Sequence, residues 1–465
     1  MSYTTIEAFV RNEEAGNATT LIVVNKASLA GVVGTLGDLA QRCCTANGFN
    51  GEAGQFIGLP ATEAGGPVML AGCNPDDGIH ALASLPHRLP EADYRLDLRG
   101  VSLDPDQLAL GWALGAYRYS RYRKSSRKAA RLVLDDAVRD RIADIIEATY
   151  LLRDLVNTPT QELGPADLAG VVRALAERFG ADYHEWVGDD LLRNNYPTIH
   201  AVGRAASAAR APRLAMLRHG PKDAPHLVLV GKGVCFDTGG LDLKTADGMR
   251  WMKKDMGGAA HAIALAQLVL AAQLPVQLTL LIPAVENAVS ADAFRPGEVI
   301  ETRGGISVEI DNTDAEGRLI LCDALAHAAE LSPDLILDFA TLTGAARVAL
   351  GADLPALFCN RDEIANALLQ AGTKTQDPLW RMPLWRPYLI LLESHVADLA
   401  NSGSSRHAGA ISAALFLERF VPERFPWCHL DVYSWNDSAR PGRPRGGEAQ
   451  GLRAYIDFLK QRYPA

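Results

Sequence analysis

Short apolar runs and helical stretches alternate along most of the chain, and this pattern predicts an α/β fold. Near the N-terminus, residues 20–24 and 67–71 are typical of strands, whereas residues 104–119 are typical of a helix. Apolar residues then recur at helical spacing over residues 135–156, where Asp135 and Asp136 favour the helix start through the helix dipole. A helix of this length would make a good connector between two domains.

From residue 164 onward, apolar strands and helices follow one another regularly. The predicted strands cover residues 226–230, 276–283, 306–310, 335–339, 354–358 and 429–433, and the predicted helices cover residues 258–272 and 316–330. Apolar strands separated by helices are typical of a mainly parallel or mixed sheet flanked by helices on both faces. In such sheets, the functional residues lie at the carboxyl ends of the strands.

The length of the chain indicates two domains, because 465 residues exceed the size of one ordinary hydrophobic core. We expect a smaller N-terminal α/β domain over residues 1–131, with a structural or regulatory role, since no cluster of catalytic residue types occurs there. A linker helix and its connection would occupy residues 132–163. The catalytic domain would comprise residues 164–465.

Charge and composition exclude several classes of protein. The net charge of −9 argues against a protein that binds nucleic acid through bulk positive charge. The basic stretch at residues 118–131 is interpreted as a solvated loop or helix face rather than a phosphate-binding patch. The longest apolar stretch, residues 259–285, is interrupted by Pro275 and by glutamines, so it predicts a helix, a turn and a strand rather than a membrane span.

Cysteine usage and the N-terminus indicate a cytoplasmic location. The chain has seven cysteines and no CxxC pair, which argues against a disulfide framework and against a structural zinc site. The first twenty residues are polar and carry no signal-peptide pattern. Neither HExxH nor GxSxG occurs, so a histidine-based zinc protease and a serine hydrolase of the nucleophile-elbow type are excluded. His261, within a predicted helix, is interpreted as structural.

A glycine-rich segment follows the predicted strand at residues 226–230. Its sequence, GKGVCFDTGG at residues 231–240, places Lys232 and Asp237 at a strand's carboxyl end. The spacing of its glycines matches neither the P-loop nor the dinucleotide-binding fingerprint. Lys244 and Asp255 follow, and Asp255 directly precedes the predicted helix at residues 258–272. Taken alone, Asp255 is more typical of a helix cap than of a ligand.

The segment NTDAEGRL, at residues 312–319, places Asp314 and Glu316 between a predicted strand and a predicted helix. As an alternative to a ligand role, Asp314 would cap that helix and Glu316 would favour its positive end. Together with Asp237 and Asp255, however, they would gather four carboxylates at one edge of the sheet. Such carboxylates repel one another, and divalent cations relieve that repulsion. Bridging carboxylates can hold two ions roughly 3.5–4 Å apart, and such a pair can activate a water molecule.

These segments together resemble the leucyl aminopeptidase (cytosol aminopeptidase) family of two-metal exopeptidases. NTDAEGR matches that family's motif in full, residues 231–240 and 253–260 match its first metal-binding segment, and TLTGA at residues 341–345 matches its substrate loop. The resemblance extends from about residue 151 to the C-terminus and is loose over the first domain. It implies a metal-dependent aminopeptidase that releases N-terminal amino acids from peptides.

The resemblance also implies a role for each matching residue. The tighter of two metal ions, Mn²⁺ or Zn²⁺, would bind to Lys232, Asp237, Asp255 and Glu316, and the more exchangeable ion would bind to Asp237, Asp314 and Glu316. A water or hydroxide bridging the ions would attack the scissile carbonyl, and Lys244 would stabilise the developing oxyanion. Arg318 would hold a bicarbonate ion that acts as general base. The substrate would contact Met252, Asn312, Thr341, Leu342 and Gly344.

The sequence departs from the family after the predicted strand at residues 429–433. The family has a run of small residues there, whereas this chain has Tyr433 and Trp435. These aromatics would either line the pocket for the substrate's first side chain, which would put a preference for leucine in doubt, or pack in the core. A non-catalytic binding relative on the same fold and a two-metal hydrolase acting on another amide are the alternative functions. The resemblance further implies a homo-hexamer.

Overall fold

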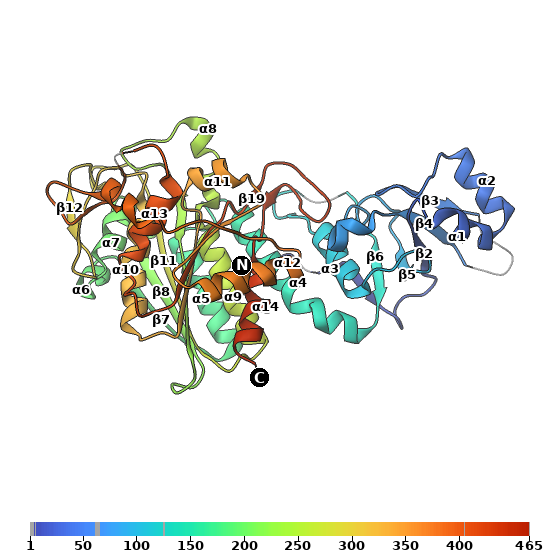
Figure 1. Ribbon diagram of the computed structural model, residues 1–465, viewed down its shortest axis with the longest axis horizontal. Helices are drawn as coiled ribbons and strands as arrows, with labels where there is room; N and C mark the ends of the chain where they lie inside the picture. The colour runs from blue at the N-terminus through green and yellow to red at the C-terminus, as the bar shows by residue number, and fades with distance from the viewer. Residues whose placement is uncertain (1–3, 5, 61–65, 124–125, 404, 465) are drawn as a thin grey trace. The chain divides into compact units, whose positions relative to one another are not determined.

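The structure is a computed structural model that describes residues 4, 6–60, 66–123, 126–403 and 405–464. Contacts divide the chain into two compact units. The N-terminal unit contains the residues up to Tyr150 together with Asn436–Gly446, and the C-terminal unit contains Leu151–Trp435 and the residues from Gly447 onward. The long helix α4 (Asp136–Asn157) therefore contributes residues to both units (Figure 1).

A six-stranded sheet forms the centre of the N-terminal unit. Its strands lie in the order β1 (Phe9–Arg11), β6 (Arg131–Leu134), β5 (Asp93–Asp97), β2 (Thr19–Val24), β4 (Val68–Gly72) and β3 (Phe56–Leu59), and only the β3–β4 pair is antiparallel. Besides the first part of α4, its α-helices are α1 (Leu29–Leu36), α2 (Asp38–Ala46) and α3 (Pro105–Ala116). Asp104 caps α3 by accepting a hydrogen bond from the backbone N–H of Asp106, as its sequence position before a proline favours. The described residues of the basic stretch before β6 form no helix, and most of them are exposed, which agrees with a solvated loop.

A nine-stranded mixed sheet forms the centre of the C-terminal unit. Four strands at its middle are parallel: β18 (Trp427–Asp431), β14 (Leu335–Ala340), β9 (His226–Gly231) and β11 (Gln277–Asn287). The sheet extends on both sides of these strands. Beyond β18, β15 (Ala356–Cys359) pairs with it antiparallel and β16 (Trp380–Arg381) pairs in parallel with β15. Beyond β11, β8 (Arg213–His219) and β7 (Asp182–Val187) follow, each antiparallel to its neighbour. Every residue of β9 and β14 is buried, which explains their continuous apolar sequences.

Helices cover both faces of this sheet (Figure 1). One face carries α5 (Pro165–Phe179), α9 (Gly257–Ala271), α12 (Asp362–Lys374) and α14 (Leu452–Arg462). The other carries α7 (Pro197–Gly203), α10 (Glu316–Glu330) and α13 (Gly409–Glu418). The shorter helices are α6 (Asp190–Arg193), α8 (Ala246–Met249) and α11 (Gly344–Leu350). The predicted α/β class, with a mainly parallel or mixed sheet between helices, is therefore confirmed.

The predicted strand at residues 306–310 forms, but not in the large sheet. It is the short strand β13 (Ser307–Glu309), which lies in a separate three-stranded sheet with β12 (Val299–Glu301) and β17 (Leu399–Ala400). The expectation that Asp314 and Glu316 follow a strand of the main sheet is therefore wrong. Strand pairing depends on a partner distant in sequence, and a short apolar run does not specify that partner.

Four strands of the main sheet were not predicted from the sequence, namely β7, β8, β16 and β10. Residues Gly233–Asp237 form β10, which pairs in parallel with the second half of β11. The predicted strand at residues 276–283 accordingly extends to Asn287. The remaining two strands, β19 (Trp435–Asn436) and β20 (Gly446–Gly447), pair with each other. Among the helices of the described residues, none has both the length and the apolar character needed to span a bilayer.

Candidate active site

Three buried carboxylates meet in the C-terminal unit. Asp237 ends β10, Asp255 lies in the 3₁₀ helix η3 (Met252–Met256), and Glu316 begins α10. Each offers one carboxylate oxygen, and the three oxygens lie within 4.8 Å of one another. In the part of the chain that the structure describes, this is the one group of acidic, histidine or cysteine side chains with an arrangement that could hold a metal ion.

Lys232 lies among these carboxylates. It occupies the junction between β9 and β10, where its backbone N–H donates to the carbonyl of Phe339 and its own carbonyl accepts from Ala259. Its Nζ atom lies 2.7 Å from Oδ2 of Asp255 and 2.9 Å from Oε1 of Glu316. The ammonium also donates to the carbonyl of Thr341 at 3.1 Å. An amine in this position is therefore within reach of any cation that the carboxylates bind.

The electrostatics of the cluster show crowded negative charge. Burial, together with the neighbouring charge of Asp255 and against the opposing effect of Lys244, raises the pKa of Asp237 to about 6. Burial also raises the pKa of Glu316 well above its ordinary value. For Lys232, burial lowers the pKa, but the carboxylates of Asp255 and Glu316 outweigh that effect and raise it overall. Such a site favours positive charge at its centre.

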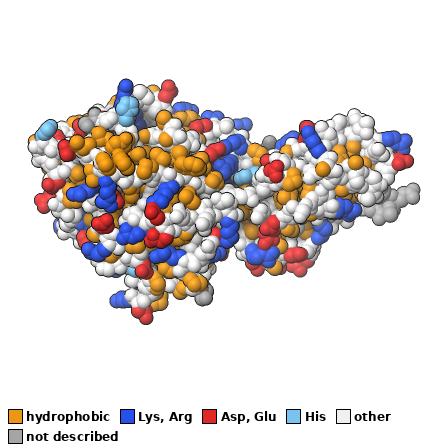
Figure 2. All heavy atoms as spheres, in the orientation of Figure 1, with side chains coloured by type: hydrophobic (Ala, Val, Ile, Leu, Met, Phe, Trp, Pro, Cys, Tyr) orange, Lys and Arg blue, Asp and Glu red, His pale blue; other side chains and the backbone are white. Residues whose placement is uncertain are grey.

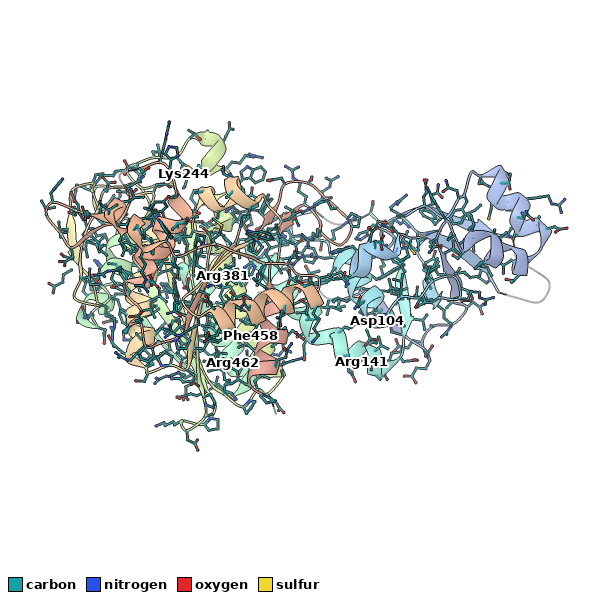
Figure 3. All side chains as sticks on the ribbon, in the orientation of Figure 1. Asp104, Arg141, Lys244, Arg381, Phe458 and Arg462 are labelled. Carbon is teal, nitrogen blue, oxygen red and sulfur yellow. The ribbon has the colours of Figure 1, made fainter. Side chains whose placement is uncertain are left out.

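Asp314 lies at the rim of the cluster, where it pairs with Lys244. The Nζ atom of Lys244 lies 2.8 Å from Oδ2 of Asp237 and also forms an ion pair with Oδ1 of Asp314. Lys244 belongs to the loop that leads from β10 into α8 (Figure 3). Its ammonium thus joins the buried carboxylate of Asp237 to the more accessible carboxylate of Asp314, whose side chain is 35% exposed.

Asn287, which lies outside the sequence motifs, and Thr313 hold the segment around Asp237 in place. Asn287, the last residue of β11, donates from Nδ2 to Oδ1 of Asp237 at 2.9 Å and to the carbonyl of Thr313 at 3.0 Å. The hydroxyl of Thr313 donates to the carbonyl of Gly239 at 2.6 Å. These bonds connect the segment around Asp237 to the segment around Asp314. A prediction that β11 continues to residue 287 would have placed Asn287 beside the end of β10.

Neither Asp255 nor Asp314 caps a helix, although the sequence left that role open for both. The N-cap of α9 is Met256, and the N-cap of α10 is Ala315, and neither helix has a side-chain cap. Asp255 instead accepts a hydrogen bond on Oδ1 from the hydroxyl of Thr341 at 2.8 Å. The capping interpretations of Asp255 and Asp314 are therefore wrong, because the chain turns through η3 and Ala315 before each helix begins.

The candidate substrate residues line one cavity of about 410 Å³. Met252, Asn312, Thr341, Leu342 and Gly344 all contribute to its wall, together with Lys232, Asp237, Lys244, Asp255, Asp314 and Arg318. Glu316 lies behind this wall, 1% exposed. The substrate loop is held by Asp431 at the end of β18, which accepts from the backbone N–H of Leu342 at 2.9 Å. The structure thus brings the predicted residues of three separate segments together.

Tyr433 and Trp435 differ in their surroundings. Tyr433 lines the cavity. Trp435 is buried, and its ring packs against that of Trp251 with a centroid distance of 5.4 Å. The pocket interpretation therefore applies to Tyr433 and the core interpretation to Trp435.

Arg318 is largely buried, with 9% of its surface exposed. Its Nη1 atom donates to the carbonyl of Asn401 at 2.7 Å, and its guanidinium lies 5.9 Å from the ring centroid of Phe416. Burial lowers the pKa of Arg318 to about 10, which leaves it a cation at neutral pH. Since Arg318 also lines the cavity, it offers positive charge to an anion there.

Together, the fold and the site define a mixed α/β protein with an acidic, lysine-containing cavity. Comparison with known proteins gives the family. The catalytic domain of the cytosol aminopeptidase family matches residues 150–456, and the N-terminal domain of M17 aminopeptidases matches residues 20–135. This chain therefore belongs to the cytosol aminopeptidase family, as its motifs predict, and the match includes the first domain, where the predicted resemblance was only loose.

Individual relatives show the same relationship along most of the chain. A probable cytosol aminopeptidase from Syntrophotalea carbinolica is 40% identical over 373 residues, which cover 76% of this chain and 74% of that protein. The crystal structure of the cytosol aminopeptidase from Coxiella burnetii is 45% identical, covers 98% of this chain and all of that chain, and superposes with a TM-score of 0.93. The bottromycin maturation enzyme BotP in complex with Mn is 32% identical, with a TM-score of 0.85 over 96% of this chain and all of BotP. The chain is accordingly an aminopeptidase-type hydrolase.

Proposed function

We propose that the protein is a metal-dependent aminopeptidase that releases the N-terminal residue of peptides bound in this cavity. The observation that carries the proposal is the meeting of Asp237, Asp255 and Glu316, whose carboxylate oxygens lie within 4.8 Å of one another around the amine of Lys232. A set of hard oxygen donors with one amine suits Mn²⁺ or Zn²⁺. The Mn complex of the related enzyme BotP supports the same proposal.

The donors fit two divalent ions. One ion would bind to Lys232, Asp237, Asp255 and Glu316, and the second to Asp237, Asp314 and Glu316. Crowding raises the pKa values of Asp237 and Glu316, and a cation among them would relieve that crowding. Lys232 would bind as the neutral amine, so its proton must leave when the ion arrives. When bound, the two ions would polarise the scissile carbonyl and activate a water molecule.

The other charged residues of the cavity have separate tasks in this proposal. Lys244 would donate to the oxyanion that develops on the scissile carbonyl, because its ammonium is held at the cavity wall by Asp237 and Asp314. Arg318 would hold a bicarbonate ion as general base, since its guanidinium is a buried cation that borders the cavity. The substrate would lie against Met252, Asn312, Thr341, Leu342 and Gly344.

The proposal extends to the organisation of the whole protein. Catalysis would belong to residues 164–465, residues 132–163 would connect the parts, and residues 1–131 would have a structural or regulatory role. A homo-hexamer and a cytoplasmic location complete the proposal. Hydrophobic side chains gather on the part of the C-terminal unit that carries α11 and α13 (Figure 2), and Val348 in α11 is 86% exposed. An apolar surface of this kind is typical of contacts between subunits, and all seven cysteines are free, as in a reducing compartment.

Of the two alternative functions, the non-catalytic one accounts for fewer observations. A non-catalytic relative would have no need for a cavity that retains every candidate metal ligand together with Lys244 and Arg318. A hydrolase acting on another amide would use the same chemistry, so it differs only in its substrate.

Release of free amino acid from short peptides tests the proposal. We expect purified protein with Mn²⁺ or Zn²⁺ to cleave aminoacyl-coumarin amides and unblocked dipeptides, and to lose that activity on chelation. Asp255→Asn should abolish activity and reduce bound metal, whereas Glu363→Gln on the exposed face of α12 should change neither. Failure to cleave any aminoacyl substrate in the presence of metal would contradict the proposal, and cleavage of N-acetylated peptides would contradict exopeptidase action.

A further inference from the structure

One wall of the cavity carries two cations that form no ion pair with a carboxylate of the described residues. Lys254 in η3 and Arg347 in α11 both line the cavity, close to Tyr433. Nζ of Lys254 lies 5.0 Å from the ring centroid of Tyr433, and Cζ of Arg347 lies 4.6 Å from it. Among the described residues, neither cation has a carboxylate within ion-pair distance. The two lysines of the carboxylate cluster differ in this respect, because Lys232 and Lys244 each contact two acids.

Lys254 is the more unusual of the two cations. It is only 7% exposed, although a buried lysine is ordinarily paired with an acid. Its neighbour Asp255 faces Lys232, with Oδ2 at 2.7 Å from that amine. Contact with an aromatic ring compensates a buried cation only in part. An anion entering the cavity would supply the missing counterion and would also attract Arg347.

The position of this wall identifies which part of a substrate would reach it. Met252, Lys254 and Asp255 belong to the same turn, η3, so the cationic wall adjoins the carboxylate cluster directly. The side chain of the first residue of a peptide, beside the amino group and the scissile carbonyl, is the substrate group that lies closest to such a cluster. Asn312 and Ala315, which precede α10, border the cavity from a different segment.

We propose that this cationic wall of Lys254, Arg347 and Tyr433 selects peptides whose first residue is aspartate or glutamate. The proposal rests on the aminopeptidase function and adds its substrate class. A side-chain carboxylate would pair with Lys254 and Arg347 and would lower the net charge of the wall from +2 to +1. A first residue of lysine or arginine would be rejected, because like charges placed together in a desolvated pocket cost several kcal/mol.

Kinetics with aminoacyl-coumarin amides test the proposal, since these substrates have no C-terminal carboxylate. For the wild-type protein we expect kcat/KM for glutamyl or aspartyl substrate to exceed that for lysyl substrate by at least about 100-fold. Lys254→Met should lower kcat/KM for the glutamyl substrate by about 10-fold or more and leave that for leucyl substrate within about 3-fold. Arg347→Met should act in the same direction with a smaller factor, because Arg347 is exposed to solvent.

Lys253→Met provides the matched control. Lys253 is the neighbouring residue, but its Nζ atom donates to the carbonyl of Asn157 at 2.6 Å and lies over the ring of Trp435, away from the cavity. Its loss removes the same charge without changing the cationic wall, so the ratio of glutamyl to leucyl cleavage should stay at the wild-type value. An equal change of that ratio in Lys253→Met and Lys254→Met would overturn the proposal.

Further measurements separate this proposal from the aminopeptidase function itself. Efficient cleavage of leucyl substrate, with glutamyl substrate no better than lysyl substrate, would overturn the proposed selectivity and leave the aminopeptidase function intact. If no aminoacyl substrate is cleaved, the aminopeptidase proposal fails. Titration calorimetry with free L-glutamate and L-leucine still decides whether Lys254 makes the cavity prefer an acidic side chain to an apolar one. If Lys254→Met lowers kcat/KM for Leu-Gly but not for Leu-Gly-amide, the cationic wall binds the C-terminal carboxylate of the peptide. That result would also overturn the proposal.

Discussion

Gly317 lies so close to the side chain of Lys232 that a larger residue at its position would push that side chain away. A Cβ atom at Gly317 would lie 2.5 Å from Cε of Lys232 and 2.6 Å from its Nζ atom. Gly317 is the second residue of α10 and directly follows Glu316. The glycine of the NTDAEGRL segment therefore makes room for a lysine that comes from the β9–β10 junction.

Gly317→Ala should displace Lys232 and lower both metal content and kcat. Alanine is ordinarily favoured over glycine in a helix by about 1 kcal/mol, so a position without crowding would gain stability. Here the added methyl group overlaps with Lys232, and overpacking of this kind costs about 1–3 kcal/mol. Gly170→Ala in α5 is the control, because a Cβ there meets no atom within 4 Å. Urea unfolding and metal analysis of both variants check the prediction, and a stabilised, fully active Gly317→Ala would contradict it.

Lys244→Ala should lower kcat by about 10²–10³-fold, as expected for loss of one oxyanion donor, while metal content stays unchanged. The ammonium contacts Asp237 and Asp314 but would not itself bind an ion. Steady-state kinetics and metal analysis of the same preparation provide the measurement, with Lys374→Ala at a surface ion pair as control. Loss of bound metal in Lys244→Ala would show that this lysine supports the metal site rather than the transition state.

Thr341→Val should weaken metal binding by about 10–100-fold, because the hydroxyl of Thr341 positions Asp255. That hydroxyl donates to Oδ1 of Asp255 at 2.8 Å and lies 3.0 Å from its backbone carbonyl. Valine keeps the shape of threonine but cannot donate. Competition with a fluorescent chelator measures metal affinity directly, and Thr373→Val on the surface of α12 controls for the substitution. Unchanged affinity with a raised KM would instead make Thr341 a residue that only contacts substrate.

His261 should make the stability of the protein sensitive to acid. Its Nδ1–H donates to the carbonyl of Gly257 at 2.7 Å, and its Nε2 accepts from the backbone N–H of Gln450 at 3.0 Å, so the folded protein requires the neutral ring. Burial lowers the pKa of His261 to about 4, from an ordinary value of 6.5. At pH values between about 4 and 6.5, the His261 ring is protonated in the unfolded chain and neutral in the folded protein. The contribution of the neutral His261 ring to the free energy of unfolding is therefore fully present above pH 6.5. It is lost as the pH falls towards 4, by up to about 1.4 kcal/mol per pH unit.

Urea unfolding from pH 7.5 to pH 4.5 measures this dependence. His261→Phe should be less stable than wild type at pH 7.5 and should show a shallower loss of stability below pH 6.5. His407→Gln, at an exposed position, controls for the loss of a histidine. Parallel stability profiles for wild type and His261→Phe would rule out the role assigned to His261.

Local sequence was sufficient for the elements that carry their own pattern. The apolar run of β9, the helix α10 and the long helix α4 were predicted to within a few residues, because burial on both faces and helical spacing leave direct traces in the sequence. The family motifs likewise identified the candidate residues at positions 232, 237, 255, 314 and 316. Residue type and order along the chain are sequence properties, so a motif can be read without knowing its surroundings.

Long-range contacts decided the rest. The sequence predicted a strand near Ser307 but not that β13 joins a separate small sheet, and it left Asp255 as a helix cap because only the path of η3 turns it towards Thr341 and Lys232. It gave no reason to place Lys254, Arg347 and Tyr433 on one wall, since each comes from a different element. The sequence by itself determined the fold class, the family and the candidate ligands. Only the tertiary structure decided which charges pair and which face the cavity unpaired, because pairing depends on distances between segments far apart along the chain.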